Sequence, residues 1–477
     1  MLFNSFIYII FFLVAVAVHY LVPHRFRWVM LLIASYIFYM AWRAELILLI
    51  LFSTLVNYYA AQGIYRRLVD GSSFSRRKQL LIISLCVNFG LLFIFKYLVF
   101  INNTFMYFFS NYPVREFDII LPIGISFYTF QAAAYTIDVY KGEVEPQRNF
   151  FKFSLFITFF PQLVAGPIER SRKLMPQLFE RKKFNIKNID AGCKWIIIGV
   201  FKKIVLADRL SILVNSVYNS PENFSGPAFV IATVFFAFQI YCDFSGYSDI
   251  AIGCAKVFGV DLTENFRQPY ISHSVKEFWR RWHITLSSWF RDYLYIPLGG
   301  SHCSKAKRQL NLLITFLVSG LWHGANWTFV IWGGLNGLLQ IIEDLIKLRK
   351  SKLLRLFRVD VALTFTAICF TWIFFRANNL SDSLYIVSNL FSGWDINRQQ
   401  AFSLINGMGL SLFEVFVCTG LLAFLRLTDL IAGDESLYAK MERFPIMMRF
   451  AFYFILLGAI ISLGVFYNAG QFIYFQF

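Results

Sequence analysis

The feature of this sequence that most restricts its fold is a series of long apolar segments. They lie at roughly 5–22, 28–42, 46–64, 80–101, 119–139, 191–213, 228–256, 309–322, 327–346, 359–376, 403–426 and 450–468. A helix that crosses a bilayer needs about 20 mostly apolar residues, and a helix satisfies its own backbone hydrogen bonds inside lipid. The sequence therefore predicts an all-α polytopic membrane protein with about 11–12 transmembrane helices.

The composition agrees with this interpretation. Of the 477 residues, 58% are hydrophobic and 15% are charged, whereas a soluble protein is about 25% charged. These values exclude a soluble enzyme, a disordered chain and a secreted disulfide scaffold. The seven cysteines are scattered and include no CxxC pair, so we expect neither a disulfide framework nor a metal site.

Basic residues divide the loops into two classes and so predict the orientation. Three loops carry clusters of them, which are Arg66, Arg67, Arg76, Arg77 and Lys78; Arg170, Arg172, Lys173, Arg181, Lys182, Lys183 and Lys187; and Lys347, Arg349, Lys350, Lys352, Arg355 and Arg358. Cytoplasmic loops of membrane proteins are enriched in Lys and Arg, and all three clusters are cytoplasmic only if the N-terminus lies outside. The loops 102–118, 214–227 and 377–402 then face outward with just Arg115 and Arg398, and the C-terminus also emerges outside.

Two segments do not fit simple spanning helices. The segment 149–165 is interrupted by Lys152 and Pro161, which predicts a partial or re-entrant helix. The segment 257–308 is too polar to cross lipid alone, so we expect it to lie at the cytoplasmic interface or to line a cavity.

A helix over Lys276–Tyr293 would carry a cationic face. At about 100° per residue, one arc of about 80° contains Lys276, Arg280, His283, Ser287 and Arg291. The neighbouring arc is aromatic and apolar, with Trp279, Trp282, Leu286, Trp289 and Tyr293. This pattern suits an anionic, partly apolar ligand such as a coenzyme A thioester. It equally suits an interfacial anchor helix whose arginines reach lipid phosphates.

His323 is the candidate catalytic base. It lies between two apolar segments, and an ionisable residue inside a membrane segment is a functional-site hypothesis by default. A neutral imidazole can accept a proton from a hydroxyl nucleophile, and Gly320, Gly324 and Ala325 leave room for a substrate or for close helix packing. The alternative is a histidine that only hydrogen-bonds a neighbouring helix.

Polar residues also interrupt the apolar segment 228–256. Asp243, Ser245, Tyr247, Ser248 and Asp249 could line a polar cavity, but hydrogen bonds that pin helices together are the slightly favoured interpretation. The chain ends in the aromatic sequence FIYFQF, which is typical of an interfacial anchor. Its Tyr474 could instead act as a nucleophile if a base lowered the barrier to losing its phenol proton.

Taken together, these motifs resemble the membrane-bound O-acyltransferase (MBOAT) superfamily. In particular the chain is similar to the bacterial branch that contains the alginate O-acetylation membrane subunit and its peptidoglycan and teichoic-acid relatives. The resemblance covers nearly the whole chain. Its most specific stretches are Gln162–Arg170, Cys242–Asp249, Phe278–His283, Arg291–Gly300 and Trp322–Trp327.

The resemblance implies a fold, a set of site residues and a partner. It implies one membrane domain over 1–477 with a core at 119–377, in which a ring of tilted helices surrounds a central tunnel. The catalytic histidine of the family falls on His323 and its second histidine on His283. The C-terminal family motif falls on 472–477, with Tyr474 as acyl carrier to a separate extracytoplasmic SGNH-type esterase/transferase.

The resemblance also defines the expected reaction. Acetyl-coenzyme A would serve as the donor, with no bound cofactor, and its acyl group would reach an exported polysaccharide such as alginate or peptidoglycan through a protein in the bacterial inner membrane. The residues expected to bind substrate are Arg280, Arg281, Ser287, Arg291, Trp322 and Asn326. The alternatives are a proton-coupled transporter and an MBOAT enzyme with a lipid or protein acceptor. No nucleic-acid partner is expected, because the basic excess follows the cytoplasmic loops.

Overall fold

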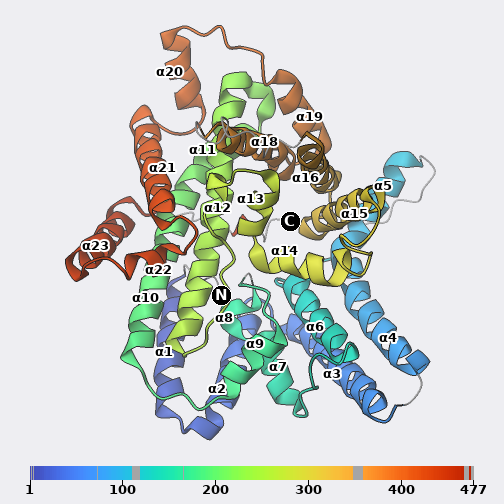
Figure 1. The fold of residues 1–477 in the computed structure, drawn as a ribbon. Coiled ribbons are helices and arrows are strands. Elements are labelled where there is room, and N and C mark those ends of the chain that lie inside the picture. The colour runs from blue at the N-terminus through green and yellow to red at the C-terminus, as the bar shows by residue number, and fades with distance from the viewer. Residues whose placement is uncertain are drawn as a thin grey trace. The chain divides into compact units, whose positions relative to one another are not determined.

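The computed structural model describes residues 1, 3, 5–71, 74–109, 119–164, 166–346, 358–466 and 472–473. Their regular structure is helical, with no strand in the described ranges, which confirms the all-α prediction (Figure 1). The chain forms two compact units, Met1–Ile196 with Ile250–Thr263, and Ile197–Asp249 with Glu264–Phe477.

The first unit holds the helices of the N-terminal part of the chain. They are α1 (Phe6–Leu21), α2 (His24–Met40), η1 (Ala44–Leu46), α3 (Ile47–Val69), α4 (Phe74–Leu92), η2 (Phe93–Tyr97), α5 (Leu98–Phe108), α6 (Ile125–Tyr140), α7 (Phe150–Thr158), α8 (Phe160–Leu163), α9 (Ser171–Phe179) and most of α10 (Ile186–Val200). The segment predicted to be partial or re-entrant is broken at Phe159, between α7 and α8. Whether it re-enters the membrane stays a prediction.

Buried amides join three helices of this unit. Asn57 on α3 accepts hydrogen bonds through Oδ1 from Nδ2 of Asn88 on α4 at 3.1 Å and from Oγ1 of Thr136 on α6 at 2.8 Å. All three residues are fully buried. Because lipid supplies no hydrogen-bond partners, such contacts are an effective way to hold apolar helices together.

The second unit holds the helices that carry the predicted site. They are η3 (Phe201–Ala207), α11 (Asp208–Tyr218), η4 (Pro221–Asn223), most of α12 (Gly226–Val257), η5 (Pro269–Ile271), α13 (Val275–Arg281), α14 (Ile284–Phe290), η6 (Arg291–Tyr295), α15 (Lys305–His323), α16 (Trp327–Ile346), α18 (Val359–Arg376), α19 (Leu380–Asn389), α20 (Arg398–Gly407), α21 (Leu412–Ala432), α22 (Leu437–Met441) and α23 (Ile446–Leu463). Of the third basic cluster, Lys347, Arg349, Lys350, Lys352 and Arg355 lie outside the described residues.

Seven described helices or helix runs are long and apolar enough to cross a bilayer, so the chain is a multi-pass membrane protein. They are Ala44–Val69, Phe74–Phe108, Gly226–Val257, Trp327–Ile346, Val359–Arg376, Leu412–Ala432 and Ile446–Leu463. This is fewer than the about 11–12 predicted from segments of about 20 residues, because several predicted segments form shorter or more polar helices. Helices α1, α2 and α6 have 16, 17 and 16 residues, and the first turn of α15 contains three basic residues.

The prediction that 403–426 forms a single helix is wrong. Helix α20 ends at Gly407, and Gly409 adopts a left-handed backbone with φ of 83°. The next helix begins only at Leu412, where Ser411 and Glu414 form a capping box. The membrane-spanning helix therefore starts nearly ten residues later than the apolar pattern indicated.

Candidate active site

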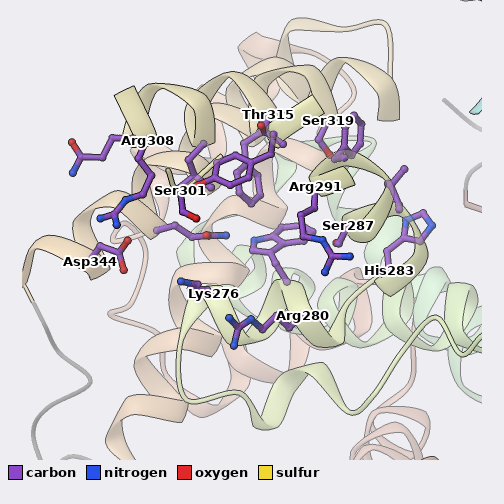
Figure 2. Close-up of a pocket in the computed structure, with 18 of the residues that line it drawn as sticks. Lys276, Arg280, His283, Ser287, Arg291, Ser301, Arg308, Thr315, Ser319 and Asp344 are labelled. Carbon is purple, nitrogen blue, oxygen red and sulfur yellow. The ribbon is translucent and has the colours of Figure 1, made fainter. Parts of the chain in front are cut away.

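A cavity of about 400 Å³ lies in the second unit, among α13, α14, η6, α15 and α16. Polar and charged side chains line much of it, and Figure 2 labels Lys276, Arg280, His283, Ser287, Arg291, Ser301, Arg308, Thr315, Ser319 and Asp344. His323 also lines it. In this view Arg308 and Asp344 lie at one end and His283 at the other, with Arg280 and Arg291 between them.

The predicted continuous helix over Lys276–Tyr293 is wrong, because the chain breaks at His283. Ser274 caps α13 by accepting a hydrogen bond from the Glu277 amide at 3.0 Å, and α13 ends at Arg281. His283 then takes a left-handed backbone with φ of 42° before α14 begins. Histidine is among the few non-glycine residues that adopt this conformation with any frequency. The break therefore needs no glycine or proline to mark it, and the spacing of apolar residues does not reveal it.

Asn265 holds the break in place. Its backbone carbonyl accepts a hydrogen bond from the amide of Ile284 at 2.9 Å, and its Oδ1 accepts one from Oγ1 of Thr285 at 2.7 Å. Asn265 is 1% exposed. The left-handed residue is thus fixed from a loop that precedes α13, and strained backbone held in this way is common at functional sites.

Despite the break, the side chains of the predicted cationic face still lie together at the cavity. All five of its members, Lys276, Arg280, His283, Ser287 and Arg291, line the cavity. Trp282, from the predicted aromatic face, is instead packed in the core at 1% exposure. Trp279 and Leu286 of the predicted aromatic face line the cavity as well, so the two short helices bring the cationic face together but do not keep the two predicted faces apart.

One face of α15 runs along the cavity and was not predicted from the sequence. Counting back from His323 in steps of three or four residues gives Ser319, Thr315, Leu312 and Arg308, and each of them lines the cavity. At 1.5 Å per residue, this face extends for about 22 Å. The same 3.6-residue spacing in the sequence was the signal that could have found these residues.

Glycines set the close approach of α15 and α16, which lie side by side (Figure 1). A Cβ atom on Gly320 would lie 2.2 Å from the carbonyl oxygen of Phe329, and one on Gly333 would lie 2.3 Å from the carbonyl oxygen of Phe316. On Gly324 it would lie 2.0 Å from the Phe329 ring. Of the two uses predicted for Gly320 and Gly324, the structure supports close helix packing.

His323 is the last residue of α15 and is 3% exposed. Its ring makes edge-on contacts with Trp322 at 5.0 Å and Trp332 at 5.1 Å between centroids. Phe375 lies 5.6 Å away and His283 lies 6.4 Å away. The imidazole therefore faces the cavity from within an aromatic enclosure that leaves few orientations open to it.

His283 is buried even more completely, at 1% exposure. Its ring packs edge-on against Phe244 at 4.6 Å. Because burial disfavours the charged imidazolium, it lowers the pKa of His283 to about 3. The side chain is therefore neutral at physiological pH and can donate and accept one hydrogen bond each.

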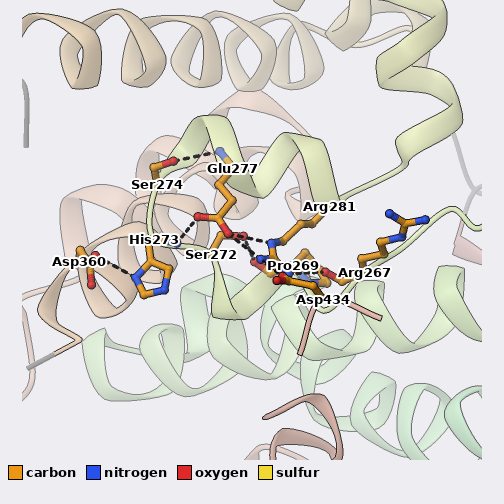
Figure 3. Close-up of polar contacts among 9 residues, drawn as sticks. All are labelled: Arg267, Pro269, Ser272, His273, Ser274, Glu277, Arg281, Asp360 and Asp434. Atoms are coloured by element: carbon orange, nitrogen blue, oxygen red, sulfur yellow. Dashed lines mark hydrogen bonds and ion pairs between the residues drawn. The ribbon is translucent and has the colours of Figure 1, made fainter. Parts of the chain in front are cut away.

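The six residues predicted to bind substrate fall into two groups. Arg280, Ser287 and Arg291 line the cavity. Arg281 does not line it but forms ion pairs with Glu277 at 2.7 Å and Asp434 at 2.6 Å, as Figure 3 shows.

The other two predicted binders, Trp322 and Asn326, are also absent from the described lining. Trp322 is 4% exposed and packs against His323. Asn326 accepts a hydrogen bond from the Thr328 amide at 3.1 Å and donates one to the Asn378 carbonyl at 3.2 Å. Trp322 is therefore part of the enclosure around His323, whereas Asn326 holds the turn between α15 and α16 against the residues after α18.

The acidic residues of α12 are paired with lysines. Asp243 lies 2.6 Å from Nζ of Lys203, which also lies 2.8 Å from Asp208. Asp249 lies 2.7 Å from Nζ of Lys202. These buried pairs join α12 to η3, which supports the favoured interpretation that this region pins helices together. No cluster of three or more metal-ligating side chains occurs within the described ranges.

Two residues of the C-terminal motif are described, and both are buried. Phe472 is 1% exposed and Ile473 is 3% exposed. The Phe472 ring stacks on Tyr247 at 4.4 Å and contacts Phe244 at 5.7 Å, and the Ile473 amide donates a hydrogen bond to Asp243 at 2.7 Å. Tyr474 lies outside the described residues.

Comparison with known proteins was consistent with these features. The model of the MBOAT, membrane-bound O-acyltransferase family, matches residues 146–381. A probable alginate O-acetylase AlgI of Azotobacter vinelandii is 39% identical over 85% of this chain and 82% of its own length. Its counterpart from Pseudomonas putida is 35% identical over 100% of both chains. A peptidoglycan O-acetyltransferase of Helicobacter pylori is 34% identical over 76% of this chain and 73% of its own length.

Proposed function

This chain belongs to the membrane-bound O-acyltransferase family, and on that premise we propose that it acetylates an exported polysaccharide from a cytoplasmic donor. The donor is acetyl-coenzyme A, and the acyl group passes through His323 chemistry to Tyr474. A separate extracytoplasmic SGNH-type transferase then carries it to the polymer. The relatives are named for alginate and peptidoglycan O-acetylation, so the acceptor is a glycan of this class.

The observation that carries the proposal is that the cavity follows α15 from a basic residue near the start of the helix to His323 at its end. Arg308 lies near one end of this helix and His323 is its last residue, and both line the same cavity. Lys276 and Arg280 add further positive charge, as does Arg291, which pairs with Asp292 at 2.8 Å. The cations therefore outnumber Asp344, the one carboxylate in the described lining. Coenzyme A is a polyanion joined by an uncharged arm to the thioester, so its phosphates suit the cations while its acyl group suits the aromatic end near His323.

The charge pattern of the loops supports entry of the donor from the cytoplasm. The first turn of α15 contains Lys305, Lys307 and Arg308, and the positive-inside rule places such a turn in the cytoplasm. Coenzyme A itself cannot cross lipid because of its charge. Only the acyl group needs to move outward, and the depth of His323 at the far end of α15 suits that transfer.

In the acyl step the acetyl group moves from the thioester of coenzyme A to the phenol oxygen of Tyr474. His323 accepts the phenol proton as the Tyr474 oxygen attacks the thioester carbonyl carbon. The C–O bond of the acyl-tyrosine forms, the C–S bond breaks, and His323 returns the proton to the departing thiolate. The products are acetyl-tyrosine and coenzyme A, and a serine of the partner then removes the acetyl group.

Contacts of the preceding two residues support a role for Tyr474. Phe472 packs against Phe244, and Phe244 packs against His283, whose ring centroid lies 6.4 Å from that of His323. The chain is therefore already in the core of this unit one residue before Tyr474. An aromatic anchor in the membrane interface would instead leave these side chains exposed.

Intact mass spectrometry of the purified full chain, after incubation with acetyl-coenzyme A, tests the proposal. We expect wild type to gain one acetyl group, and both His323→Ala and Tyr474→Phe to gain none. His302→Ala is the matched control, because His302 is an exposed histidine outside the cavity. If Tyr474→Phe still becomes acetylated, the tyrosine relay is wrong; if His323→Ala does, the assigned base is wrong.

A further inference from the structure

We propose that a second cavity, in the first unit, binds the phosphate headgroup of an anionic phospholipid. The cavity measures about 340 Å³ and is formed by the end of α1, the start of α2, α7, α9 and the residues after α12. It shares no residue with the cavity of the candidate active site. The proposal is therefore independent of the proposed function.

The cavity concentrates positive charge. Four basic side chains line it, which are Arg25, Arg27, Lys152 and Lys182. Glu180 is the one carboxylate in the described lining, and it is exposed. None of the four cations forms an ion pair with a carboxylate in the described part of the chain. Four cations against one carboxylate leave an excess of positive charge in the cavity, and such an excess favours binding of an anion.

Local contacts orient these cations without neutralising them. Arg27 donates a hydrogen bond to the Lys182 carbonyl at 2.7 Å, and Lys182 donates one to the Gly259 carbonyl. Nζ of Lys152 lies 5.0 Å from the centroid of Phe179 and 5.7 Å from that of Trp28. Carbonyls and aromatic faces hold the side chains in place, and a cation held in advance loses less entropy when it binds a ligand.

His19 provides an independent sign of a ligand. It lines the cavity and is 5% exposed, yet its Nδ1 atom has no hydrogen-bond partner among the described residues. Its ring packs edge-on against Tyr20 and Phe258, both about 5 Å away. A buried polar atom without a hydrogen bond costs free energy. A phosphate group could supply the missing bond, either by accepting one from Nδ1–H or by donating its own proton to Nδ1.

The surroundings favour a lipid over a soluble phosphate. The apolar helix α1 ends at Leu21, next to the cavity, and neighbouring apolar side chains are exposed: Leu21 at 83%, Phe26 at 48% and Phe184 at 59%. Trp28 lines the cavity itself, and tryptophan is enriched at the level of lipid headgroups. The positive-inside rule places these loops in the cytoplasm, where anionic headgroups meet basic pockets between helices.

Native mass spectrometry of the detergent-purified full chain tests this site. The chain is titrated with phosphatidylglycerol, with zwitterionic phosphatidylcholine and with phosphatidylglycerol in the presence of inorganic phosphate. We expect phosphatidylglycerol to bind on the order of tenfold more tightly than phosphatidylcholine, and inorganic phosphate not to displace it. Arg25→Gln with Lys152→Gln should weaken phosphatidylglycerol binding on the order of tenfold.

The matched control is Arg181→Gln with Lys183→Gln. These two exposed residues flank Lys182 but do not line the cavity, so the control removes the same amount of charge from beside the cavity rather than from its lining. An equal loss in the control would mean diffuse attraction and would overturn the site. Displacement by inorganic phosphate would overturn the lipid assignment, and equal binding of phosphatidylcholine would overturn both.

A second variant protects the test against misfolding. His19→Phe keeps an aromatic ring against Tyr20 and Phe258 and removes the buried nitrogen. We expect it to weaken phosphatidylglycerol binding at an unchanged thermal midpoint. Unchanged affinity in both His19→Phe and a folded double variant would refute the proposal.

Discussion

The backbone amide of Ile473 donates a hydrogen bond of 2.7 Å to Oδ2 of Asp243, across 230 positions of sequence. Oδ1 of the same carboxylate lies 2.6 Å from Nζ of Lys203. A buried ion pair thus holds the backbone one residue before Tyr474. A hydrogen bond to a charged acceptor is stronger than one between neutral groups, so this contact can fix the chain more tightly than apolar packing alone.

Removing this carboxylate should release the C-terminal residues. In Asp243→Ala the Ile473 amide loses its acceptor, and we expect acetylation of the protein in the intact-mass assay to slow by at least about tenfold. The affinity for acetyl-coenzyme A should stay the same, because Asp243 does not line the donor cavity. Initial rates and donor binding are measured on the same preparations.

Asp249→Ala is the control for this prediction. Asp249 is also a buried residue of α12 that pairs with a lysine of η3. Lys203 keeps Asp208 as a partner in Asp243→Ala, whereas Lys202 loses its partner carboxylate in Asp249→Ala, so the control should cost at least as much stability. Equal loss of acetylation in both would show that the effect is general destabilisation and that Asp243 has no particular role in holding the chain end.

Arg280 and Arg281 are neighbours with different expected roles. Arg280 lines the cavity, whereas Arg281 is engaged by Glu277 and Asp434. We expect Arg280→Gln to raise KM for acetyl-coenzyme A about tenfold, as the loss of one charge-assisted contact would. Arg281→Gln should lower the thermal midpoint and leave KM unchanged. A rise in KM of equal size in both variants would contradict this division.

The glycine contacts predict opposite outcomes at two adjacent positions of α16. Gly333→Ala would push a methyl group to 2.3 Å from the Phe316 carbonyl oxygen, so we expect a loss of about 1–3 kcal/mol in stability and a loss of activity as α15 shifts. Gly334→Ala meets just the side chain of Leu317, at 3.4 Å. Alanine is about 0.5–1 kcal/mol better than glycine in a helix, so Gly334→Ala should be neutral or stabilising. Thermal midpoints in detergent compare the two variants.

His283 should make the protein less stable in acid. Its pKa is about 3 in the folded chain and about 6.5 when unfolded. Below pH 6.5 the unfolded chain binds a proton that the folded chain does not. The free energy of unfolding therefore decreases as the pH is lowered, by up to about 1.4 kcal/mol per pH unit.

The variant His283→Asn tests this dependence. Asparagine tolerates the left-handed backbone at this position and does not titrate. Its thermal midpoint should therefore fall less than that of wild type between about pH 7 and pH 5. The same substitution at exposed His302 should leave the pH dependence as in wild type. A parallel fall in His283→Asn and wild type would contradict the buried, neutral histidine.

Much of the fold class and part of the site could be predicted from local sequence. Apolar segments of the right length predict helices because each helix satisfies its own backbone within one segment. The shared side of Lys276, Arg280 and Arg291 was also predictable, because it depends on spacing over a few turns. The same spacing along α15 relates Ser319 and Arg308 to His323, so the sequence also contains the signal for that face.

What the sequence by itself determined is therefore what local periodicity and charge control: an all-helical membrane chain, its basic loops and one cationic face. The tertiary structure decided the break at His283, which Asn265 holds from a separate loop, and the burial of Phe472 and Ile473 against α12. It also decided that Arg281 is engaged in ion pairs while Arg280 faces the cavity. These features depend on contacts between residues far apart in the chain, and such contacts leave no periodic pattern in the segments that make them.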